Sequence, residues 1–191
     1  KVHVRDIWLK AELLSGNTTG QLTPVIKLDG ETDGASVALV VTDPEGYAVY
    51  EGPAAGDTIE IEGIQPWSHA APVLYHAVLT LRDADGVLQE VVPYDIGFRR
   101  FEMINGVMCL NGERVVFNGV NRHEWNADRG RAIGADDMHA AMAVFKKNNI
   151  NAVRTCHYPD QSLWYDLCDR NGIYMIDETN LESHGSWQKL G

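Results

Sequence analysis

Apolar residues in the first hundred positions recur in short stretches that are separated by turn sequences. The run at 37–41 is apolar and ends at Asp43-Pro44-Glu45-Gly46, a composition typical of a turn. Residues 75–81 alternate apolar and polar side chains, which predicts a strand with one buried face. The turn sequence at 83–86 then leads into a strand expected at 87–92, as in a hairpin. This spacing predicts a β-sandwich over residues 1–100, of the size of an immunoglobulin-like domain.

The pattern changes at Phe101. Asn105-Gly106 and Asn111-Gly112 are tight-turn sequences, and they predict a small meander from Phe101 to about Phe117. Strand-like segments then alternate with helix-like ones. The strands are expected at 115–120, 151–156 and 173–176.

Two amphipathic helices are expected between these strands. Asp136 or Asp137 is a candidate cap for the first, and Ser162 for the second. Both show apolar residues at helical spacing. The first set is Met138, Ala141, Met142 and Phe145, and the second is Leu163, Trp164, Leu167 and Cys168.

Strand, helix, strand, helix and strand in this order predict a parallel sheet with crossover helices. Val153, Tyr174 and Ile176 are expected on the inner face of that sheet. A closed eight-stranded α/β barrel takes roughly 250 residues. Residues 101–191 are therefore expected to be the start of a TIM barrel, truncated after about three βα units, or else a small open α/β unit. The fold class is multidomain, with the sandwich first.

Composition excludes some classes of function. The formal charge is −11, which disfavours binding to nucleic acid and to anionic membranes. No apolar run reaches the length of a membrane helix. Lys1 is not a natural start, so the absence of a targeting segment says little. The chain has three cysteines, of which Cys156 and Cys168 lie in apolar contexts, and this predicts free thiols and a reducing compartment.

Polar residues follow each predicted parallel strand directly. The three clusters are 121–125, Arg154 with 157–159, and 177–185. The carboxyl ends of parallel strands meet at one edge of a sheet, where α/β barrels assemble their chemistry. We therefore expect the three clusters to face one cavity.

Each cluster allows more than one interpretation. Glu182 and His184 offer a carboxylate and an imidazole to Mg²⁺, Mn²⁺ or Zn²⁺, or they belong to a solvated loop. Asp177 or Glu178 is either one of a pair of glycosidase carboxylates or a carboxylate that pairs with Arg154 and orders the rim.

Aromatic and imidazole side chains point to sugar binding. His123 and His157 each follow a strand beside an arginine or an aromatic residue, which favours ligand contact over a structural role. Trp125, Tyr158, Trp164 and Trp187 are candidate platforms for sugar rings, although the helical position of Trp164 favours core packing.

Residues 151–176 resemble the first signature of glycoside hydrolase family 2, from Asn-Ala-Val-Arg through His-Tyr-Pro and Leu-Trp-Tyr to the apolar quartet 173–176. Asn118-Gly-Val-Asn-Arg-His-Glu124 is also similar to that family. Residues 177–185 resemble its β-galactosidase branch in particular, and residues 1–100 resemble the immunoglobulin-like domain that precedes the barrel.

The resemblance implies a retaining β-galactosidase that acts on terminal β-galactosides such as lactose, with two catalytic glutamates. No catalytic residue is expected within this chain, because both glutamates would lie beyond Gly191. Glu182 and His184 resemble ligands of an active-site Mg²⁺, with Mn²⁺ as the alternative. A Na⁺ ion is implied for the parent enzyme, and we identify no ligand for it here. His123 and His157 resemble substrate-binding residues, and Arg154 resembles the arginine that orients the nucleophile.

Two rival interpretations stay open. One is another specificity of the same family, a β-glucuronidase or a β-mannosidase. The other is a non-catalytic carbohydrate-binding or interaction module with the sandwich as its working part. The expected partner is a β-galactoside substrate, with no nucleic-acid or membrane partner. A homo-oligomeric parent enzyme in the bacterial cytoplasm is expected.

Overall fold

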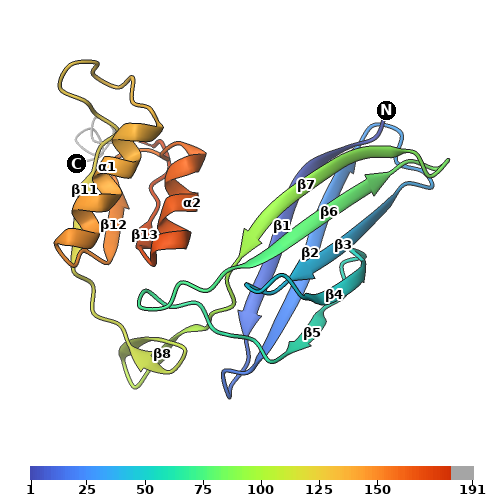
Figure 1. Ribbon diagram of the computed structural model, residues 1–191, viewed down its shortest axis with the longest axis horizontal. Coiled ribbons are helices and arrows are strands. Elements are labelled where there is room, and N and C mark those ends of the chain that lie inside the picture. The colour runs from blue at the N-terminus through green and yellow to red at the C-terminus, as the bar shows by residue number, and fades with distance from the viewer. Residues whose placement is uncertain (182–191) are drawn as a thin grey trace, which may run out of the picture. The chain divides into compact units, whose positions relative to one another are not determined.

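The computed structural model describes residues 1–181. The chain divides into two compact units, of which the first is Lys1–Val115 and the second begins at Val116 (Figure 1).

The first unit contains two antiparallel sheets, which confirms the predicted β-sandwich. One sheet has the order β1-β2-β5, and the other has the order β4-β3-β6-β7. The strands of the first sheet are β1 (His3–Leu13), β2 (Thr19–Asp29) and β5 (Ile59–Glu62). Those of the second are β3 (Ser36–Thr42), β4 (Ala48–Pro53), β6 (Tyr75–Arg82) and β7 (Leu88–Ile96).

The core of the sandwich forms because alternate side chains of both sheets point inward. In β6 the buried positions fall at every second residue, as the sequence predicts. Tyr75 and Phe98 meet edge to face with ring centroids 5.2 Å apart. Gly20 allows this packing, because a Cβ atom there would lie 2.6 Å from the Phe98 ring.

A three-stranded meander completes the first unit. It consists of β8 (Phe101–Ile104), β9 (Val107–Leu110) and β10 (Glu113–Arg114). Both connecting turns are Asn-Gly pairs with positive φ at each residue, which is the geometry of a type I′ hairpin. The two turns predicted from the sequence are therefore confirmed.

The second unit is a parallel sheet with two crossover helices. The sheet has the order β11-β12-β13, and both strand pairs are parallel. Its elements are β11 (Gly119–Arg122), α1 (Ala135–Lys147), β12 (Ala152–Thr155), α2 (Ser162–Asn171) and β13 (Tyr174–Ile176). The first strand begins four residues later than predicted. Within the described residues 116–181 the sheet is open and does not close into a barrel.

Both helices bury the apolar stripes that the sequence predicts. Met138, Met142 and Phe145 of α1 are buried, as are Trp164, Leu167 and Cys168 of α2. They pack with Val153 in one hydrophobic cluster. The prediction that Val153 shares the inner face with Tyr174 and Ile176 is wrong. Tyr174 and Ile176 lie opposite Ala152 and Arg154, so Val153, one residue along, points to the other face and packs with the helices.

The helix caps differ from the prediction. Gly134 is the N-cap of α1, and Asp137 is the third helical residue, whose carboxylate accepts the Gly134 backbone N–H at 2.9 Å. The N-cap of α2 is Gln161, with no side-chain cap, and Ser162 is the first helical residue. In α2 the helix ends at Gly172, whose φ of 70° is left-handed and suits glycine.

Asp137 makes the start of α1 sensitive to acid. Its carboxylate accepts hydrogen bonds from the Gly134 N–H and the Asn126 amide, and Arg129 adds attraction. Together these outweigh partial burial and hold the pKa of Asp137 below its ordinary value of 3.8. The folded state thus binds this proton less tightly than the unfolded chain does.

We expect Asp137→Asn to lower the free energy of unfolding at neutral pH and to lose that effect as the pH falls through the lowered pKa. Chemical denaturation of both proteins at a series of pH values measures the difference. Asp136→Asn, an exposed change in the same turn, is the control. An Asp137→Asn deficit that stays constant down to the lowest pH would contradict the prediction.

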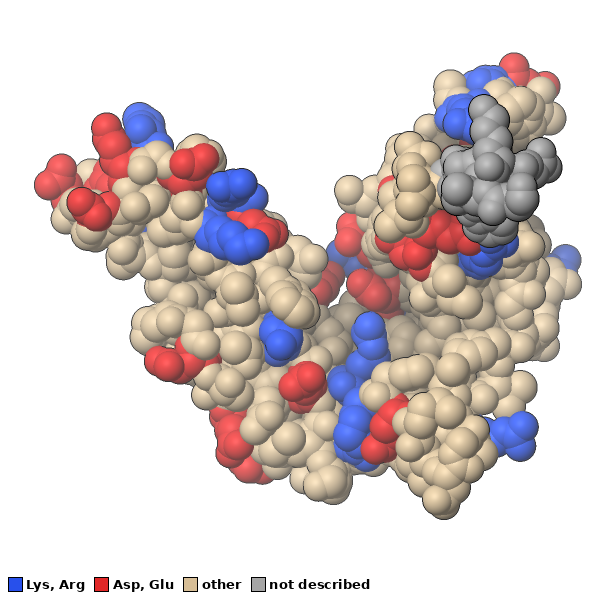
Figure 2. All heavy atoms as spheres, turned by 180° about the vertical axis from the view of Figure 1, so that it is seen from behind, with Lys and Arg blue, Asp and Glu red and all other residues tan. Residues whose placement is uncertain are grey.

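Charges on the described surface are mixed in sign. On the face drawn in Figure 2, Lys and Arg side chains lie in small groups between Asp and Glu side chains. No helix among residues 1–181 is long and apolar enough to cross a membrane. Cys109, Cys156 and Cys168 are all buried free thiols, as the sequence predicts.

Candidate functional site

The polar residues that follow the three parallel strands lie at one edge of the sheet. In the ladder, Asn121 lies opposite Arg154, and Arg154 lies opposite Ile176. Arg154 hydrogen-bonds the Asn121 side chain at 3.3 Å and pairs with Glu178. The described parts of the three predicted clusters therefore come together.

Arg154 and Glu178 form the centre of this edge. Two guanidinium nitrogens, Nε and Nη2, contact Glu178 Oε1. Burial acts to raise the pKa of Glu178, but hydrogen bonds from His157 and Arg154 outweigh it and lower that pKa. Glu178 is therefore ionised at neutral pH. The pairing of Glu178 with Arg154 is one of the two interpretations that the sequence left open.

His157 has a defined tautomer because of Glu178. Its Nδ1 lies 3.0 Å from Glu178 Oε2 and 3.3 Å from an Arg154 nitrogen. An ionised carboxylate only accepts and a guanidinium only donates, so Nδ1 cannot bond both in one protonation state. The shorter contact assigns the proton to Nδ1. The neutral ring then presents the lone pair of Nε2, which accepts a hydrogen bond from a hydroxyl group.

His123 lies beside His157. Their ring centroids are 5.6 Å apart and the rings meet edge to face. Nδ1 of His123 lies 3.4 Å from the Tyr158 hydroxyl, and the Arg131 guanidinium lies 5.0 Å from the Tyr158 ring centre. Both histidines are exposed. The sequence-predicted pair thus forms an accessible rim of two imidazoles.

A layer of hydrogen bonds holds the strand ends in place. The Thr155 hydroxyl donates to Asp177 at 3.1 Å and accepts the Glu178 backbone N–H at 3.0 Å. The Tyr165 hydroxyl also donates to Asp177, at 2.8 Å. Burial and the Asp177 carboxylate raise the pKa of Tyr165 to about 12, so it stays protonated. The hydrogen bond from its backbone N–H to Thr155 thus holds the main chain of Glu178 in place.

A buried ion pair lies next to the histidines in the sequence. Arg122 pairs with Asp160, and its guanidinium carbon lies 3.9 Å from the centre of the Trp164 ring. Burial raises the pKa of Asp160 against the opposing attraction of Arg122. Arg122 belongs to the predicted cluster 121–125, but its pairing with Asp160 was missed, because nothing in the sequence pattern shows that residues 38 apart meet.

The predicted aromatic platforms divide into two groups. Trp164 is fully buried, so it belongs to the core, as its helical position indicates. Trp125 is 66% exposed and Tyr158 is half-buried beside His123. Trp187, Glu182 and His184 lie outside the described residues.

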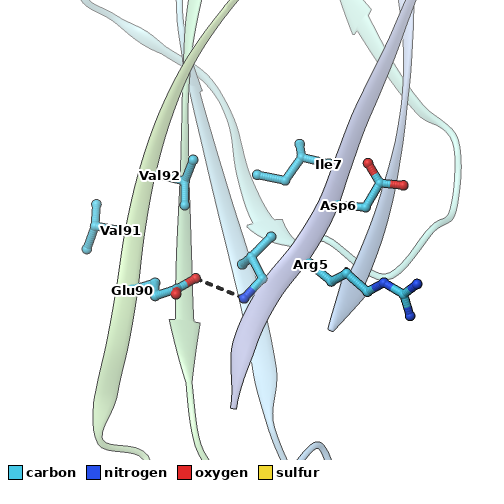
Figure 3. Close-up of a pocket in the computed structure, with 7 residues that line it drawn as sticks. Arg5, Asp6, Ile7, Glu90, Val91 and Val92 are labelled. Carbon is cyan, nitrogen blue, oxygen red and sulfur yellow. Dashed lines mark hydrogen bonds between the residues drawn. The ribbon is translucent and has the colours of Figure 1, made fainter. Parts of the chain in front are cut away.

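The first unit contains an open groove between β1 and β7. Figure 3 shows Ile7 and Val92 pointing toward each other across it, while Arg5 and Asp6 lie on the other side of β1. The Glu90 carboxylate already has a hydrogen-bond partner, because it accepts the Val4 backbone N–H at 2.9 Å. The described groove lacks a set of converging polar groups, so the strand-end edge is the better candidate site.

Family models match both parts of the chain. The one described as "Glycosyl hydrolases family 2" matches residues 2–99, and the one described as "Glycosyl hydrolases family 2, TIM barrel domain" matches residues 101–191. The chain belongs to glycosyl hydrolase family 2. The meander and the parallel unit together are the part that matches the family's TIM-barrel domain, and the sandwich is the part that precedes it.

Curated relatives share high identity over the whole chain. A "Beta-galactosidase" of Streptococcus thermophilus is 48% identical and matches 100% of this chain with 19% of its own length. A "Beta-galactosidase large subunit" of Lactobacillus acidophilus is 45% identical, again over 100% of this chain, and is matched over 31% of its length. The chain thus spans about a fifth to a third of these relatives.

Solved structures share the fold of this chain. A β-glucuronidase of Parabacteroides merdae superposes with a TM-score of 0.83 at 27% identity, over 93% of this chain and 24% of that one. A β-glucuronidase from Ruminococcus gnavus gives a TM-score of 0.83 at 25% identity, over 94% and 30%. The identity to these glucuronidases is far below that to the β-galactosidases.

Proposed function

We propose that the whole protein is a retaining β-galactosidase that hydrolyses terminal β-D-galactosides such as lactose. The observation that carries this proposal is the identity of 45–48% to curated β-galactosidases over the entire chain. The structural relatives that are β-glucuronidases share only 25–29%. The convergence of imidazole, guanidinium and carboxylate groups at one sheet edge supports a sugar site.

His157 and His123 are the proposed contacts to galactose hydroxyls. The lone pair on His157 Nε2, set by the Nδ1 contact to Glu178, accepts a hydrogen bond from one hydroxyl. An interaction that strengthens as the sugar approaches an oxocarbenium-like transition state lowers the barrier to the chemical step. Trp125 is the proposed apolar platform, because it is the exposed indole of this edge among the described residues.

Arg154 is the proposed positioning residue for the nucleophile. A retaining glycosidase uses two carboxyl groups about 5–5.5 Å apart, one as nucleophile and one as acid and base. By family resemblance these glutamates lie downstream of this chain. A guanidinium beside the nucleophile favours its ionised form. Glu178 would hold Arg154 in place for that task, through the contacts to Nε and Nη2.

Glu182 and His184 are the proposed ligands of a divalent ion. One carboxylate oxygen and one imidazole nitrogen suit Mg²⁺ or Mn²⁺ when water and a further carboxylate complete the shell. Such an ion would stabilise negative charge at the site. Asp177 and Glu178, at the start of the same segment, already have protein partners, so they do not compete as ligands.

Substrate choice tests the proposal. The whole protein is assayed with the nitrophenyl β-glycosides of galactose, glucuronic acid and mannose. We expect kcat/KM for the galactoside to exceed the others by about a hundredfold or more, because wrong hydroxyl positions leave the imidazoles unpaired. A preference for the glucuronide would establish the second candidate, a β-glucuronidase, which the structural neighbours favour.

Metal removal is expected to inactivate the whole protein. A chelator should abolish galactoside turnover, and Mg²⁺ should restore it. His184→Ala should raise the Mg²⁺ concentration needed for half-maximal activity by about tenfold or more. The control is His139→Ala, an exposed change on α1. An unchanged metal requirement in His184→Ala would remove that residue from the ligand set.

The partner and compartment are proposals too. A homo-oligomeric protein in the bacterial cytoplasm is proposed. The three free thiols bear on the compartment alone, because free thiols suit a reducing environment. Light scattering of the whole protein gives the oligomeric state.

A further inference from the structure

Three metal-ligating side chains lie together at the rim of the parallel sheet. One nitrogen of His123, one of His157 and the Sγ of Cys156 all lie within 4.8 Å of one another. They follow β11 and β12, which are parallel neighbours. We propose that these three residues form a zinc site, with two imidazoles and one thiolate as ligands and water in the fourth position.

The donor set favours zinc over the harder ions. Two nitrogens and one sulfur suit a borderline-soft cation, whereas Mg²⁺ and Ca²⁺ prefer oxygen. Three protein ligands with an open fourth position is a common zinc arrangement. From Zn–N and Zn–S bond lengths, the ligand atoms of a tetrahedral site are roughly 3.3–3.7 Å apart. Because the observed atoms lie within 4.8 Å of one another, the group needs to contract by at most about 1–1.5 Å to bind zinc.

The contacts at Nδ1 of both histidines also suit a zinc site. A zinc-bound histidine usually donates its other N–H to a carboxylate, carbonyl or water, which fixes the ring and the tautomer. His157 has this contact, with Nδ1 at 3.0 Å from Glu178. Nδ1 of His123 lies 3.4 Å from the Tyr158 hydroxyl. Both rings are therefore held at Nδ1, which leaves Nε2 to face an ion.

Cys156 is the residue that distinguishes zinc binding from sugar binding. It is 2% exposed, and its Sγ donates to the Arg122 carbonyl at 3.3 Å. On zinc binding the S–H bond breaks and the proton leaves to solvent. One Zn–S and two Zn–N bonds form, and the hydrated ion gives up five of its six waters, so that one water stays in the fourth position. No redox change is involved.

Zinc at this site would occupy the imidazoles that the proposed function assigns to galactose hydroxyls. In the whole protein it should then exclude the sugar and inhibit competitively. This consequence rests on the proposed function, whereas zinc binding itself does not.

Cobalt is the spectroscopic probe for the site. The chain is titrated with Co²⁺ in the presence of excess Mg²⁺, and the thiolate-to-cobalt charge-transfer band is recorded. We expect the band to saturate at one equivalent and to disappear when Zn²⁺ displaces Co²⁺. The band should be absent in Cys156→Ser and retained in the matched variants Cys109→Ser and Cys168→Ser. No thiolate band, or a band that survives Cys156→Ser, would overturn the proposal.

The histidine variants test the nitrogen ligands. His123→Ala and His157→Ala should each weaken zinc binding at least about tenfold, as should Glu178→Gln through His157. His139→Ala should leave zinc affinity unchanged, and circular dichroism checks that each variant is folded. Equal zinc affinity in all four variants would overturn the assignment of the imidazoles.

Inhibition of the whole protein separates this proposal from the proposed function. Zinc inhibition that is competitive with galactoside and lost in Cys156→Ser supports both. If zinc binds without affecting galactoside turnover, the proposed zinc site stands, and the proposed role of these two histidines in sugar binding is overturned.

Discussion

Replacing His157 by alanine should lower kcat of the whole protein for a galactoside by about 10²–10³, with a much smaller change in KM. Loss of one preorganised hydrogen-bond partner of a transition state has an effect of about this size. His157 Nε2 is such a partner, since Nδ1 is committed to Glu178 at 3.0 Å. A contact that strengthens only in the transition state appears in kcat, and a contact made equally in both states appears in KM. Steady-state kinetics of the variant decide between the two.

A matched substitution tests which ring nitrogen matters. His157→Asn places an amide N–H near the position of Nδ1, so it can still donate to Glu178 while the Nε2 atom is lost. If Nε2 binds the sugar, His157→Asn should be as impaired as His157→Ala. Recovery of kcat in His157→Asn would mean that the ring serves only to hold Glu178. His139→Ala, on the exposed side of α1, should leave kcat and KM unchanged.

Local sequence patterns predicted much of the fold. The stripe from Met138 to Phe145 specifies one buried face of α1, and that face is buried. The Asn-Gly pairs specify left-handed turns, because few other residues adopt positive φ at low cost. These features depend on neighbours in the chain, so they are visible without the tertiary structure.

Strands β1 and β2 were missed for physical reasons. In β1 the pairing with β2 shifts register between Val4 and Asp6, so the period of two is broken. In β2 the inward position between Leu22 and Ile26 is Pro24, which argues against a strand when read from the sequence. The wrong face assigned to Val153 has a related cause. β12 has only four residues, Ala-Val-Arg-Thr, and each of its faces carries one apolar and one polar residue, so alternation does not show which face is covered by the helices.

The candidate site was only partly predictable. His123, Arg154 and His157 could be found because residues after parallel strands meet at one edge. The tautomer of His157 could not, because it depends on Glu178, 21 residues away. The burial of Arg122 against Trp164 also depends on packing between distant segments. Such contacts are set by the tertiary structure and leave no local signal.

Replacing Trp164 by alanine should lower the free energy of unfolding of the second unit by about 3–5 kcal/mol. Large-to-small changes at buried aromatic residues cost about this much, from lost burial and the cavity left behind. Trp164 is fully buried and meets Phe145 edge to face at 5.6 Å. Its ring also covers the Arg122 guanidinium, so its loss leaves the Arg122–Asp160 pair without its apolar cover. Domains have net stabilities of about 5–15 kcal/mol, so the effect is severe.

Trp8 offers a matched control for burial. It too has a cation on its ring, Lys10 at 4.7 Å, but it is 59% exposed on β1. Trp8→Ala should therefore change stability by about 0.5 kcal/mol or less, as surface substitutions usually do. Trp164→Phe keeps an aromatic ring beneath Arg122, and it removes an indole N–H that has no hydrogen-bond partner among the described residues. It should cost clearly less than Trp164→Ala.

Hydrogen exchange combined with urea denaturation locates the loss. In Trp164→Ala the amides of α1 and α2 should lose protection, while those of β3 and β6 should keep theirs, because the two units have separate hydrophobic clusters. A Trp164→Ala loss below about 1 kcal/mol, or an equal loss in both units, would contradict the prediction. If α1 and α2 alone are affected, the packing of Trp164 stabilises the helices that cover the parallel sheet, and through Arg122 and Asp160 it holds the segments that carry His123 and His157.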